Sequence, residues 1–275
     1  MRAAWLASLP GFATRGLRSL RTSGYWLGSP IESMARRLGG REPLPPLWLR
    51  RHTGPVRDFV TAAHEMSSTM QRLGVFEPTD LVLDVGCGCG AMAFEFARLL
   101  STDGRYLGFD VHRPSIAWCR RRFASDPRFR FEIADVATPF SPGRPRRAED
   151  YVFPASDGAA GFVLAKSVFT HLMEREARRY LDEIRRVLRT GRRALVTAFL
   201  FAPSAPTPAF PFPDRIAPIR WRVRVRPHSA VAYSQPDFEA LVQDAGLRIA
   251  EMVPGFWPGA ASTPVAQDIL LLSHR

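Results

Sequence analysis

The amino-acid sequence predicts an α/β fold, in which a mostly parallel β-sheet carries helices on both faces. From residue 56 onward, short apolar runs alternate with longer segments whose apolar residues recur every three or four positions. The short runs are apolar almost throughout, which is typical of parallel strands buried on both faces. With 275 residues and 46% hydrophobic content, the chain is long enough to bury the core of one main domain.

The first half of this domain predicts a helix followed by alternating strands and helices. Phe59, Ala63 and Met66 recur at helical spacing, so a helix is expected over residues 56–73. Pro114 suits the first turn of a helix, where its missing N–H is not needed. The elements expected next are strands at 81–85, 105–110 and 128–135 and helices at 91–100 and 114–124.

The second half continues the alternation after a polar crossover at 144–158. The stretch "EREARRYLDEIRRVL" has a strong helical pattern, with its apolar residues on one face and its charges on the other. The remaining expected strands lie at 161–167, 192–201, 247–253 and 267–273, and the expected helices lie at 174–188 and 236–246.

Positive charge is concentrated on two appendages to this domain. The formal net charge is +12, yet residues 1–57 carry ten arginines against two acids, and residues 201–235 carry five arginines against Asp214. The rest of the chain is neutral, so an anionic partner would meet the appendages. We expect a basic N-terminal extension with a proline-rich linker at 1–55, the main domain at 56–275, and an insertion at 202–235 after the fifth strand.

Residues 1–25 are open to three interpretations. On a helix, Arg15, Arg18 and Arg21 lie on one side and apolar residues roughly opposite. This pattern is typical of a basic helix lying on an anionic membrane or of an organellar transit peptide, and an unordered tail is the third interpretation. No transmembrane segment is expected, because five prolines interrupt the longest uncharged run, residues 194–213.

The three cysteines are too few for a disulfide framework, which indicates a reducing compartment, and we expect a cytoplasmic protein. Cys87 and Cys89 are one residue apart, and Cys119 is distant. This set lacks a fourth ligand and the two-residue gap of a zinc knuckle. We therefore interpret the cysteines as small buried apolar residues and expect no metal site.

The stretch "LVLDVGCGCG", residues 81–90, predicts a ligand-binding turn. In a parallel sheet, ligands bind at the carboxyl ends of the strands, and the first strand-to-helix turn forms the floor of that site. Gly86, Gly88 and Gly90 permit positive φ and a close approach to the backbone. The pattern is D-x-G-x-G-x-G rather than G-x-G-x-x-G, which places Asp84 beside the turn. A carboxylate there would repel a pyrophosphate but suits a ligand that carries an amino group and a sulfonium.

Two further aspartates end neighbouring strands. Asp110 closes "YLGFD", where a carboxylate can accept hydrogen bonds from ribose hydroxyls. Asp135 closes "FEIAD", where a carboxylate can accept from an adenine amino group. Either residue alone would be explained as a helix N-cap. Together with Asp84 at one edge of the sheet, they predict a nucleoside site.

The stretches "LVLDVGCGCG", "SVFTHLMEREARRYLDEIRRVLRTG", "PHSAVAYSQPDFEALVQDAGL" and "GFWPG…QDILLLS" make residues 56–275 resemble the class I S-adenosylmethionine-dependent methyltransferases, in particular a bacterial branch. The resemblance implies a Rossmann-like sheet of seven strands whose last strand is antiparallel, and S-adenosylmethionine as cofactor. It also implies the following cofactor contacts: the three glycines at the methionine moiety, Asp110 and Val111 at the ribose, and Asp135 with the Val136 backbone at the adenine.

The sequence departs from the family pattern at two places. "GAAGFV" lacks the acid usual before the fourth strand, and "RTGRR" stands where Pro-Gly-Gly is common before the fifth. Neither stretch contains a residue assigned to the cofactor. We expect these departures to affect details of the fold near the crossover rather than cofactor binding.

The acceptor side is expected in "LAKSVFTHL", after the fourth strand. Ser167 and Phe169 are expected beside the methyl donor, and Ser167 and His171 are the candidate catalytic residues. Histidine is the residue type suited to acid–base chemistry at pH 7, but His171 or Thr170 could instead cap the following helix. Lys166 either orients an anionic acceptor or extends from the strand end into solvent.

The insertion after the fifth strand is expected to overhang the acceptor pocket as a lid. It is aromatic and basic, and Arg220, Arg222, Arg224 and Arg226 would share one face of a strand. Such a face suits an anionic or glycan-phosphate acceptor, or it protects an edge strand. The signatures of amino-directed nucleobase methylases and of cytosine-C5 enzymes are absent from the sequence after the fourth strand.

We therefore expect methyl transfer to a small-molecule, sugar or lipid-linked acceptor. One alternative is an RNA methyltransferase that grips phosphates with the basic appendages. The other is a non-catalytic S-adenosylmethionine-binding scaffold. Methylation on oxygen, nitrogen or carbon is left open.

Overall fold

The computed structural model describes residues 28–50, 59–138, 143–202, 214–216, 219–221, 230–255 and 266–275. The chain divides into two compact units, residues 1–59 and residues 60–275. The basic segment 1–25 lies outside the described residues. None of the described helices is long and apolar enough to cross a membrane.

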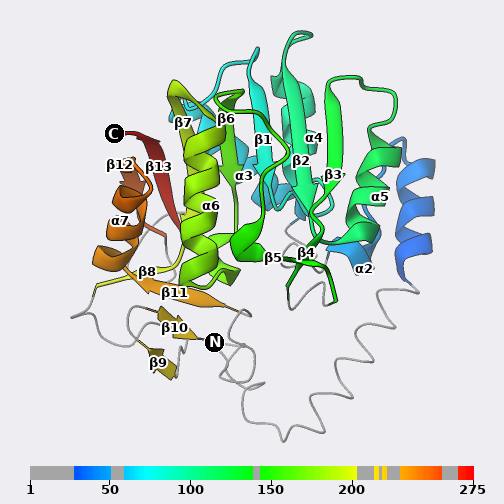
Figure 1. Cartoon of the computed structure of the whole chain (residues 1–275). Coiled ribbons are helices and arrows are strands. Elements are labelled where there is room, and N and C mark those ends of the chain that lie inside the picture. Colours follow the sequence, from blue (N-terminus) through cyan, green and yellow to red (C-terminus); the bar gives the residue numbers. More distant parts are fainter. Residues whose placement is uncertain are drawn as a thin grey trace, which may run out of the picture. The chain divides into compact units, whose positions relative to one another are not determined.

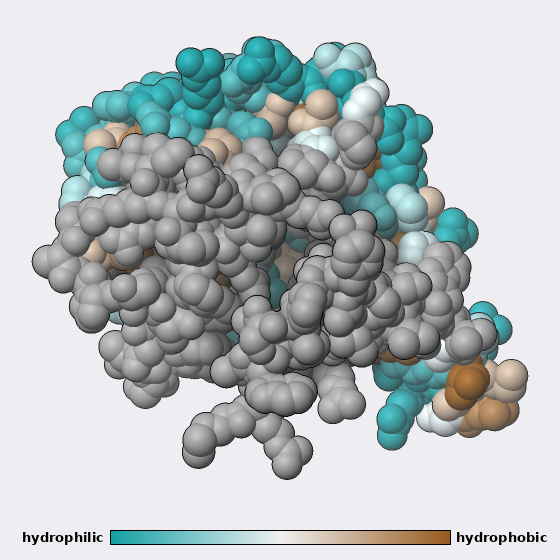
Figure 2. All heavy atoms as spheres, turned by 90° about the horizontal axis from the view of Figure 1, so that it is seen from below, coloured by the Kyte–Doolittle hydropathy of each residue, from teal (hydrophilic) through white to brown (hydrophobic). Residues whose placement is uncertain are grey.

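The first unit contains a helix over residues 28–38 and the short helix α2 (Leu47–Arg50). The Leu47 backbone N–H donates to Ser29 Oγ at 3.0 Å, and the buried Arg50 pairs with Glu32, so the polar face of the first helix holds the following segment. Apolar residues gather in a brown group on the otherwise largely hydrophilic described surface in Figure 2. Large apolar side chains of this helix are exposed at Ile31, Met34 and Leu38.

The second unit is built on a seven-stranded sheet (Figure 1). All neighbouring strands pair in parallel except the last strand of the chain, which is antiparallel to both neighbours. The predicted mixed sheet is therefore confirmed. Its order across the sheet is β12 (Leu247–Val253), β13 (Asp268–His274), β7 (Leu188–Ala198), β6 (Ala160–Ala165), β1 (Leu81–Val85), β2 (Arg105–Asp110) and β3 (Phe129–Ile133).

Helices cover both faces of this sheet, as expected. Figure 1 shows α6 in front of the sheet and α3 and α4 behind it. Each helix lies within two residues of its predicted start or end, apart from the start of α3, because residues 56–58 are not described. The helices are α3 (Phe59–Arg72), α4 (Ala91–Leu99), α5 (Arg113–Arg122), α6 (Glu174–Val187) and α7 (Gln235–Asp244).

Alternation along the strands decides which side chains meet which helices. On β1 and β2, Leu83, Val85, Leu107 and Phe109 share one apolar cluster with residues of α6 and α7. The residues that alternate with these along the strands face the helices on the other side of the sheet. The Tyr106 ring, for example, contacts that of Phe96 from α4, with their centroids 5.8 Å apart.

Three strand predictions were wrong at their ends. The strand expected over 128–135 stops at Ile133, two residues before Asp135. The strand expected over 161–167 stops at Ala165, because the chain turns sharply at Ser167. The strand expected over 192–201 begins at Leu188, directly after α6, and ends at Ala198. A register irregularity between the β6 and β7 pairs, with Gly191 at φ 81°, absorbs the extra residues.

The two stretches that depart from the family pattern meet at a buried ion cluster around Asp80. Asp80, which is 3% exposed, pairs with Arg189 at 2.9 Å and with Arg192. Gly161 makes room for it, since a Cβ there would lie 1.9 Å from Asp80 Oδ1. The stretches "GAAGFV" and "RTGRR" thus supply the space and the arginines for one carboxylate that precedes β1.

The insertion after β7 contributes to a second, four-stranded sheet ordered β8 (Leu200–Phe201), β11 (Val231–Ser234), β10 (Ile219–Trp221) and β9 (Asp214–Ile216). Tyr233, which the sequence placed in the lid, is fully buried in the main core, and its hydroxyl donates to Leu172 O at 2.6 Å. Arg222, Arg224 and Arg226 lie outside the described residues. The lid thus stays a prediction.

Candidate functional site

The turn after β1, residues 86–90, has the backbone shape that its glycines predict. Gly86, Gly88 and Gly90 all have positive φ, at 70°, 54° and 82°. The Gly86 and Cys87 N–H groups both donate to Phe109 O, at 2.9 and 3.1 Å, which ties the turn to β2. A Cβ on Gly86 would lie 2.7 Å from Val168 Cγ2, so this glycine also permits a close approach by the segment after β6. We call residues 86–90 the glycine turn.

The cysteines pack beneath the glycine turn. Cys87 fills the space over Gly108, where a Cβ would lie 3.0 Å from the Cys87 Sγ atom, and Cys119 fills the space behind Gly90. Burial raises the pKa of the Cys87 and Cys119 thiols well above the ordinary value. In the described part of the chain, no cluster of three His, Cys, Asp or Glu residues could hold a metal ion.

Asp84 lies at the carboxyl end of β1, and its side chain is almost completely buried. Its Oδ2 accepts a hydrogen bond from the Tyr106 hydroxyl at 2.5 Å. Burial raises the pKa of Asp84 to about 7, although the Tyr106 hydrogen bond and the positive charge of Lys166 oppose that rise. The site therefore contains a carboxyl group whose charge changes near neutral pH, and a nearby cation would favour its ionised form.

Lys166 lies on the same face of the sheet as Asp84. It follows Leu164 by two positions, and Leu164 is the residue paired with Asp84 between β6 and β1. Burial lowers the pKa of Lys166, and the charges of Asp84 and Glu65 act against that change. The half-buried Lys166 side chain is thus balanced by carboxylates of the protein.

Asp110, at the end of β2, braces the glycine turn. Its Oδ2 accepts the Gly88 N–H at 2.8 Å, and its Oδ1 accepts the His112 N–H at 2.7 Å. Burial raises the pKa of Asp110, although these two hydrogen bonds oppose the change. A carboxylate offers about four lone-pair positions. Asp110 therefore retains capacity to accept from ligand hydroxyls, and Val111 continues the chain beside it.

Asp135 follows β3, and its side chain is 44% exposed. Its Oδ1 pairs with Arg144 at 3.2 Å and with Arg113 at 3.6 Å. These arginines were not found from the sequence, because their pairing depends on how the loops fold back. The next residue, Val136, is buried in β4 (Val136–Ala137), which pairs with β5 (Arg146–Arg147).

We call residues 166–171 the β6 turn. Its side chains, which the sequence analysis grouped together, lie in different surroundings. Ser167 has a φ of 60°, whereas Phe169 is fully buried and packs edge-on against Phe238 in the core. The Phe169 ring is therefore part of the core beneath α6 and α7. His171 is half-buried and ends the short 3₁₀ helix Phe169–His171.

The expectation that Thr170 or His171 caps α6 was wrong. The N-cap of this helix is Met173, whose backbone N–H donates to the Glu176 carboxylate at 2.7 Å. The Thr170 hydroxyl instead donates to Ser167 O at 3.1 Å, inside the β6 turn. Leu172 separates His171 from Met173, so the cap of α6 lies beyond His171 in the chain.

A polar network at the ends of three strands was missed by sequence reasoning. The Ser167 N–H donates to Thr197 Oγ1 at 2.7 Å, and both side-chain hydroxyls lie within hydrogen-bond distance of Gln267 Oε1. Gln267 immediately precedes β13. Its only signal in the sequence was its place in the stretch "QDILLLS", which carried part of the family resemblance.

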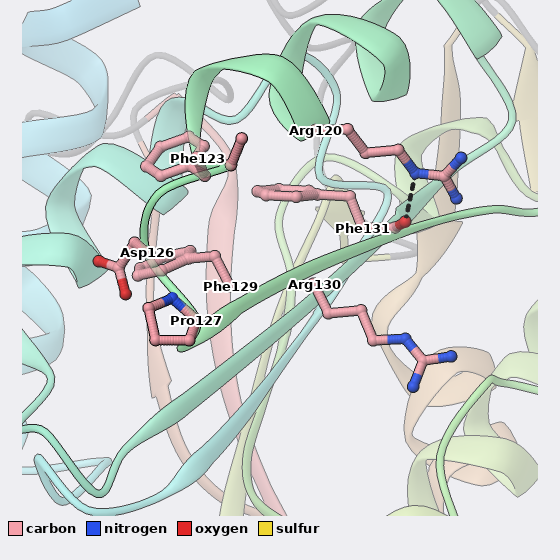
Figure 3. Close-up of a pocket in the computed structure, with 8 residues that line it drawn as sticks. Arg120, Phe123, Asp126, Pro127, Phe129, Arg130 and Phe131 are labelled. Atoms are coloured by element: carbon pink, nitrogen blue, oxygen red, sulfur yellow. Dashed lines mark hydrogen bonds between the residues drawn. The ribbon is translucent and has the colours of Figure 1, made fainter.

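A cavity of about 370 Å³ lies at the edge strand β3 rather than at the glycine turn. Figure 3 shows the guanidinium groups of Arg120 and Arg130 on one side and the rings of Phe123 and Phe129 on the other. The Arg120 Nε–H donates to Phe131 O at 2.8 Å. None of the sequence-predicted site residues lines this cavity, whose walls are formed by Arg120, Phe123, Ala124, Asp126, Pro127, Phe129, Arg130 and Phe131.

Known proteins resemble this chain over part of its length. The family model described as a methyltransferase domain matches residues 82–191. An uncharacterized 37.1 kDa protein in a transposon of Streptomyces fradiae is 28% identical over 135 residues, which cover 49% of this chain and 34% of that protein. An arsenite methyltransferase of Halobacterium salinarum is 26% identical over 182 residues, which cover 64% of this chain and 39% of that protein. The chain thus spans well under half the length of these relatives.

The fold agrees with the sequence match. The structure of a SAM-dependent methyltransferase from Aquifex aeolicus superposes with a TM-score of 0.52 at 16% identity, covering 83% of this chain and 98% of that one. The matched sequence region contains the glycine turn, Asp110 and the β6 turn, and the strand order with an antiparallel last strand is the one expected for this fold. Residues 82–191 thus match a methyltransferase domain, and the fold of the second unit is that of S-adenosylmethionine-dependent methyltransferases.

Proposed function

We propose that this chain transfers a methyl group from S-adenosylmethionine to a small-molecule acceptor by in-line displacement. The observation that carries the proposal is the glycine turn itself. Its three glycines have positive φ, and the Gly88 N–H is held by Asp110, the residue expected at the ribose. This arrangement leaves a shaped backbone surface beside the buried carboxyl group of Asp84 and the half-buried one of Asp110, at the carboxyl edge of the sheet.

The residues present fit the chemistry of this cofactor. Gly86 is exposed within the turn, so a ligand can approach its backbone. A cationic amino or sulfonium group near Asp84 would favour the ionised carboxylate, and Asp110 has lone pairs for ribose hydroxyls. We assign the methionine end to the glycine turn with Ser167, the ribose to Asp110 and Val111, and the adenine to Asp135 and the Val136 backbone.

Positioning is the main catalytic contribution of these residues. When bound, S-adenosylmethionine supplies an activated methyl group. The chain's part is to hold the acceptor atom in line with that group, and positioning of this kind contributes roughly 7–11 kcal/mol in well-oriented reactions. His171, at the end of the β6 turn, is the candidate for taking a proton from the acceptor, a contribution of about 10²–10⁴-fold where a proton must leave.

A small acceptor is supported by two observations. The sequence lacks the signatures of nucleobase methylases after the fourth strand, and one relative methylates arsenite, as its name states. The arginine-rich insertion lies between β7 and α7 in the chain and adds positive charge to this part of the sequence. These features favour an anionic small molecule, including a sugar or lipid-linked one that carries phosphate or carboxylate.

Calorimetric titration with S-adenosylmethionine and S-adenosylhomocysteine tests the proposal. We expect micromolar binding to the full chain, a loss of at least tenfold in an Asp110→Ala variant, and unchanged binding in an Asp103→Ala control, since Asp103 lies exposed on the loop before β2. A folded protein that binds neither ligand would refute the cofactor assignment. Binding without methyl transfer to any anionic small molecule would instead favour a non-catalytic scaffold.

A further inference from the structure

Ser167 stands out among the described residues because it is the one non-glycine residue with positive φ. L-residues disfavour this left-handed conformation, and serine has no special tolerance for it. Such a conformation persists where surrounding contacts enforce it, and it is concentrated at functional sites.

Hydrogen bonds engage every polar group of Ser167. Its N–H donates to Thr197 Oγ1 at 2.7 Å, and its carbonyl oxygen accepts the Thr170 hydroxyl at 3.1 Å. Its own hydroxyl reaches Gln267 Oε1 at 3.0 Å. Two of these three partners are distant in the chain, since Thr197 lies in β7 and Gln267 immediately precedes β13.

The directions of these bonds are determined by Thr197. Its Oγ1 lies 2.5 Å from Gln267 Oε1, a separation typical of O–H···O hydrogen bonds and shorter than an N–H···O bond. The Thr197 hydroxyl therefore donates a hydrogen bond to Gln267 Oε1 and accepts one from the Ser167 N–H. The Gln267 side-chain carbonyl oxygen thus accepts hydrogen bonds from both hydroxyl groups, and this geometry determines the orientation of the Gln267 amide.

The neighbouring residue anchors Gln267. Asp268 is 5% exposed, and its two carboxylate oxygens accept the Leu200 and Gly255 N–H groups, each at 2.9 Å. Thr197 is fully buried. The network therefore rests on rigid elements rather than on mobile side chains, and it joins the adjacent strands β6, β7 and β13.

We propose that Gln267 and Thr197 are positioning residues, which hold Ser167 in its left-handed conformation and so set the β6 turn against the glycine turn before a ligand binds. Val168, the next residue, already packs where a Cβ of Gly86 would be. The residue immediately before β13 thereby contributes to a site that lies at the ends of β1 and β6. This inference rests on the proposed function, because it takes Ser167 to contact the cofactor.

A double-mutant cycle with glycine tests this coupling. Glycine adopts positive φ without support, so a Ser167→Gly background no longer needs the network. In the natural background, Gln267→Leu should weaken S-adenosylhomocysteine binding by roughly tenfold, because the binding-competent turn becomes a minor conformer. In the Ser167→Gly background, the same substitution should weaken binding by less than about threefold.

Calorimetry on the full-length protein supplies the four affinities, and thermal denaturation checks that each variant folds. Thr197→Val provides a second cycle if Gln267→Leu does not fold. Thr197→Val removes the acceptor of the backbone N–H of residue 167 in both backgrounds, so the penalty for that loss cancels in the cycle. A general structural role for Gln267 would give the same loss in both backgrounds.

The outcomes separate the inference from the proposed function. If the natural protein is folded and does not bind S-adenosylhomocysteine, the proposed function fails and this inference fails with it. If it binds, and Gln267→Leu lowers affinity equally in both backgrounds or in neither, the positioning role alone is overturned. A loss that the Ser167→Gly background largely removes supports it.

Discussion

Replacing Asp84 by asparagine should abolish a large part of the pH dependence of stability. Burial raises the pKa of Asp84 from its ordinary value of 3.8 to about 7 in the folded protein. Asparagine has nearly the same shape, and its Oδ1 can still accept the Tyr106 hydroxyl. The substitution therefore removes a titrating group from the core while keeping its main hydrogen bond.

The expected magnitude follows from the pKa of Asp84. Since this pKa is higher in the folded than in the unfolded chain, its contribution to stability is fully present below about pH 4 and is lost as the pH rises to about 7. A pKa difference of one is worth about 1.4 kcal/mol, so the whole effect is on the order of 4 kcal/mol. Between pH 5 and 8.5, the variant should gain about 3 kcal/mol relative to the natural protein.

Urea unfolding at several pH values between 5 and 8.5 measures this difference. Other titratable groups near Asp84 are Tyr106, Lys166, Asp110, Cys87 and Cys119. They remain in both proteins, so most of their contribution cancels when the two free energies of unfolding are subtracted. A Tyr106→Phe variant should shift the midpoint of the natural protein's pH dependence upward, because the pKa of Asp84 rises further without the hydroxyl.

A constant difference between the two proteins would refute this account. If the free energies of unfolding of the Asp84→Asn variant and the natural protein stay parallel within about 0.5 kcal/mol over this range, Asp84 does not change its charge near pH 7. The interpretation of its burial would then be wrong, and the carboxylate would have to be ionised throughout.

Two further substitutions test the turn and the core. Gly86→Ala should abolish S-adenosylhomocysteine binding, because a Cβ would lie 2.7 Å from Val168 Cγ2. Gly158 has a similar φ of 62° with open space around it, so Gly158→Ala should lower the free energy of unfolding by only about 1–2 kcal/mol and leave calorimetric binding intact. Equal binding by both variants would contradict the role of the turn. Glu183→Ala should lower the urea-unfolding free energy by about 3–5 kcal/mol, because this 2% exposed carboxylate accepts the Phe153 N–H at 2.7 Å and pairs with Arg186. An exposed Asp182→Ala control should change it by less than about 0.5 kcal/mol, and a comparable loss in both would contradict the proposed ion pair.

Local sequence was sufficient to predict the type and order of the elements. Helical periodicity predicted α6 to within one residue, and the apolar run "LVLDV" matches β1 at both ends. The three glycines predicted positive φ because no other residue adopts it readily. The ends of β6 and β7 were less predictable, since they depend on the pairing register and on a bulge near Gly191.

Local sequence was insufficient wherever a residue's role depends on a distant partner. The family resemblance placed Phe169 beside the cofactor, and that assignment stays a prediction, whereas the contact of its ring with Phe238 of α7 could not be read from the sequence. Likewise, the charge of Asp135 was visible in the sequence, whereas its pairing with Arg113 and Arg144 required the folded loops.

The sequence by itself determined the α/β architecture, the glycine turn and the strand-end aspartates, because these follow from periodicity and backbone conformation within a few residues. The tertiary structure alone decided that Ser167 is held by Gln267, one hundred residues further along the chain. The antiparallel entry of β13 beside β7 brings these residues together at one edge of the sheet. Strand order, which is set by packing of the whole domain, therefore decides which polar side chains share the site.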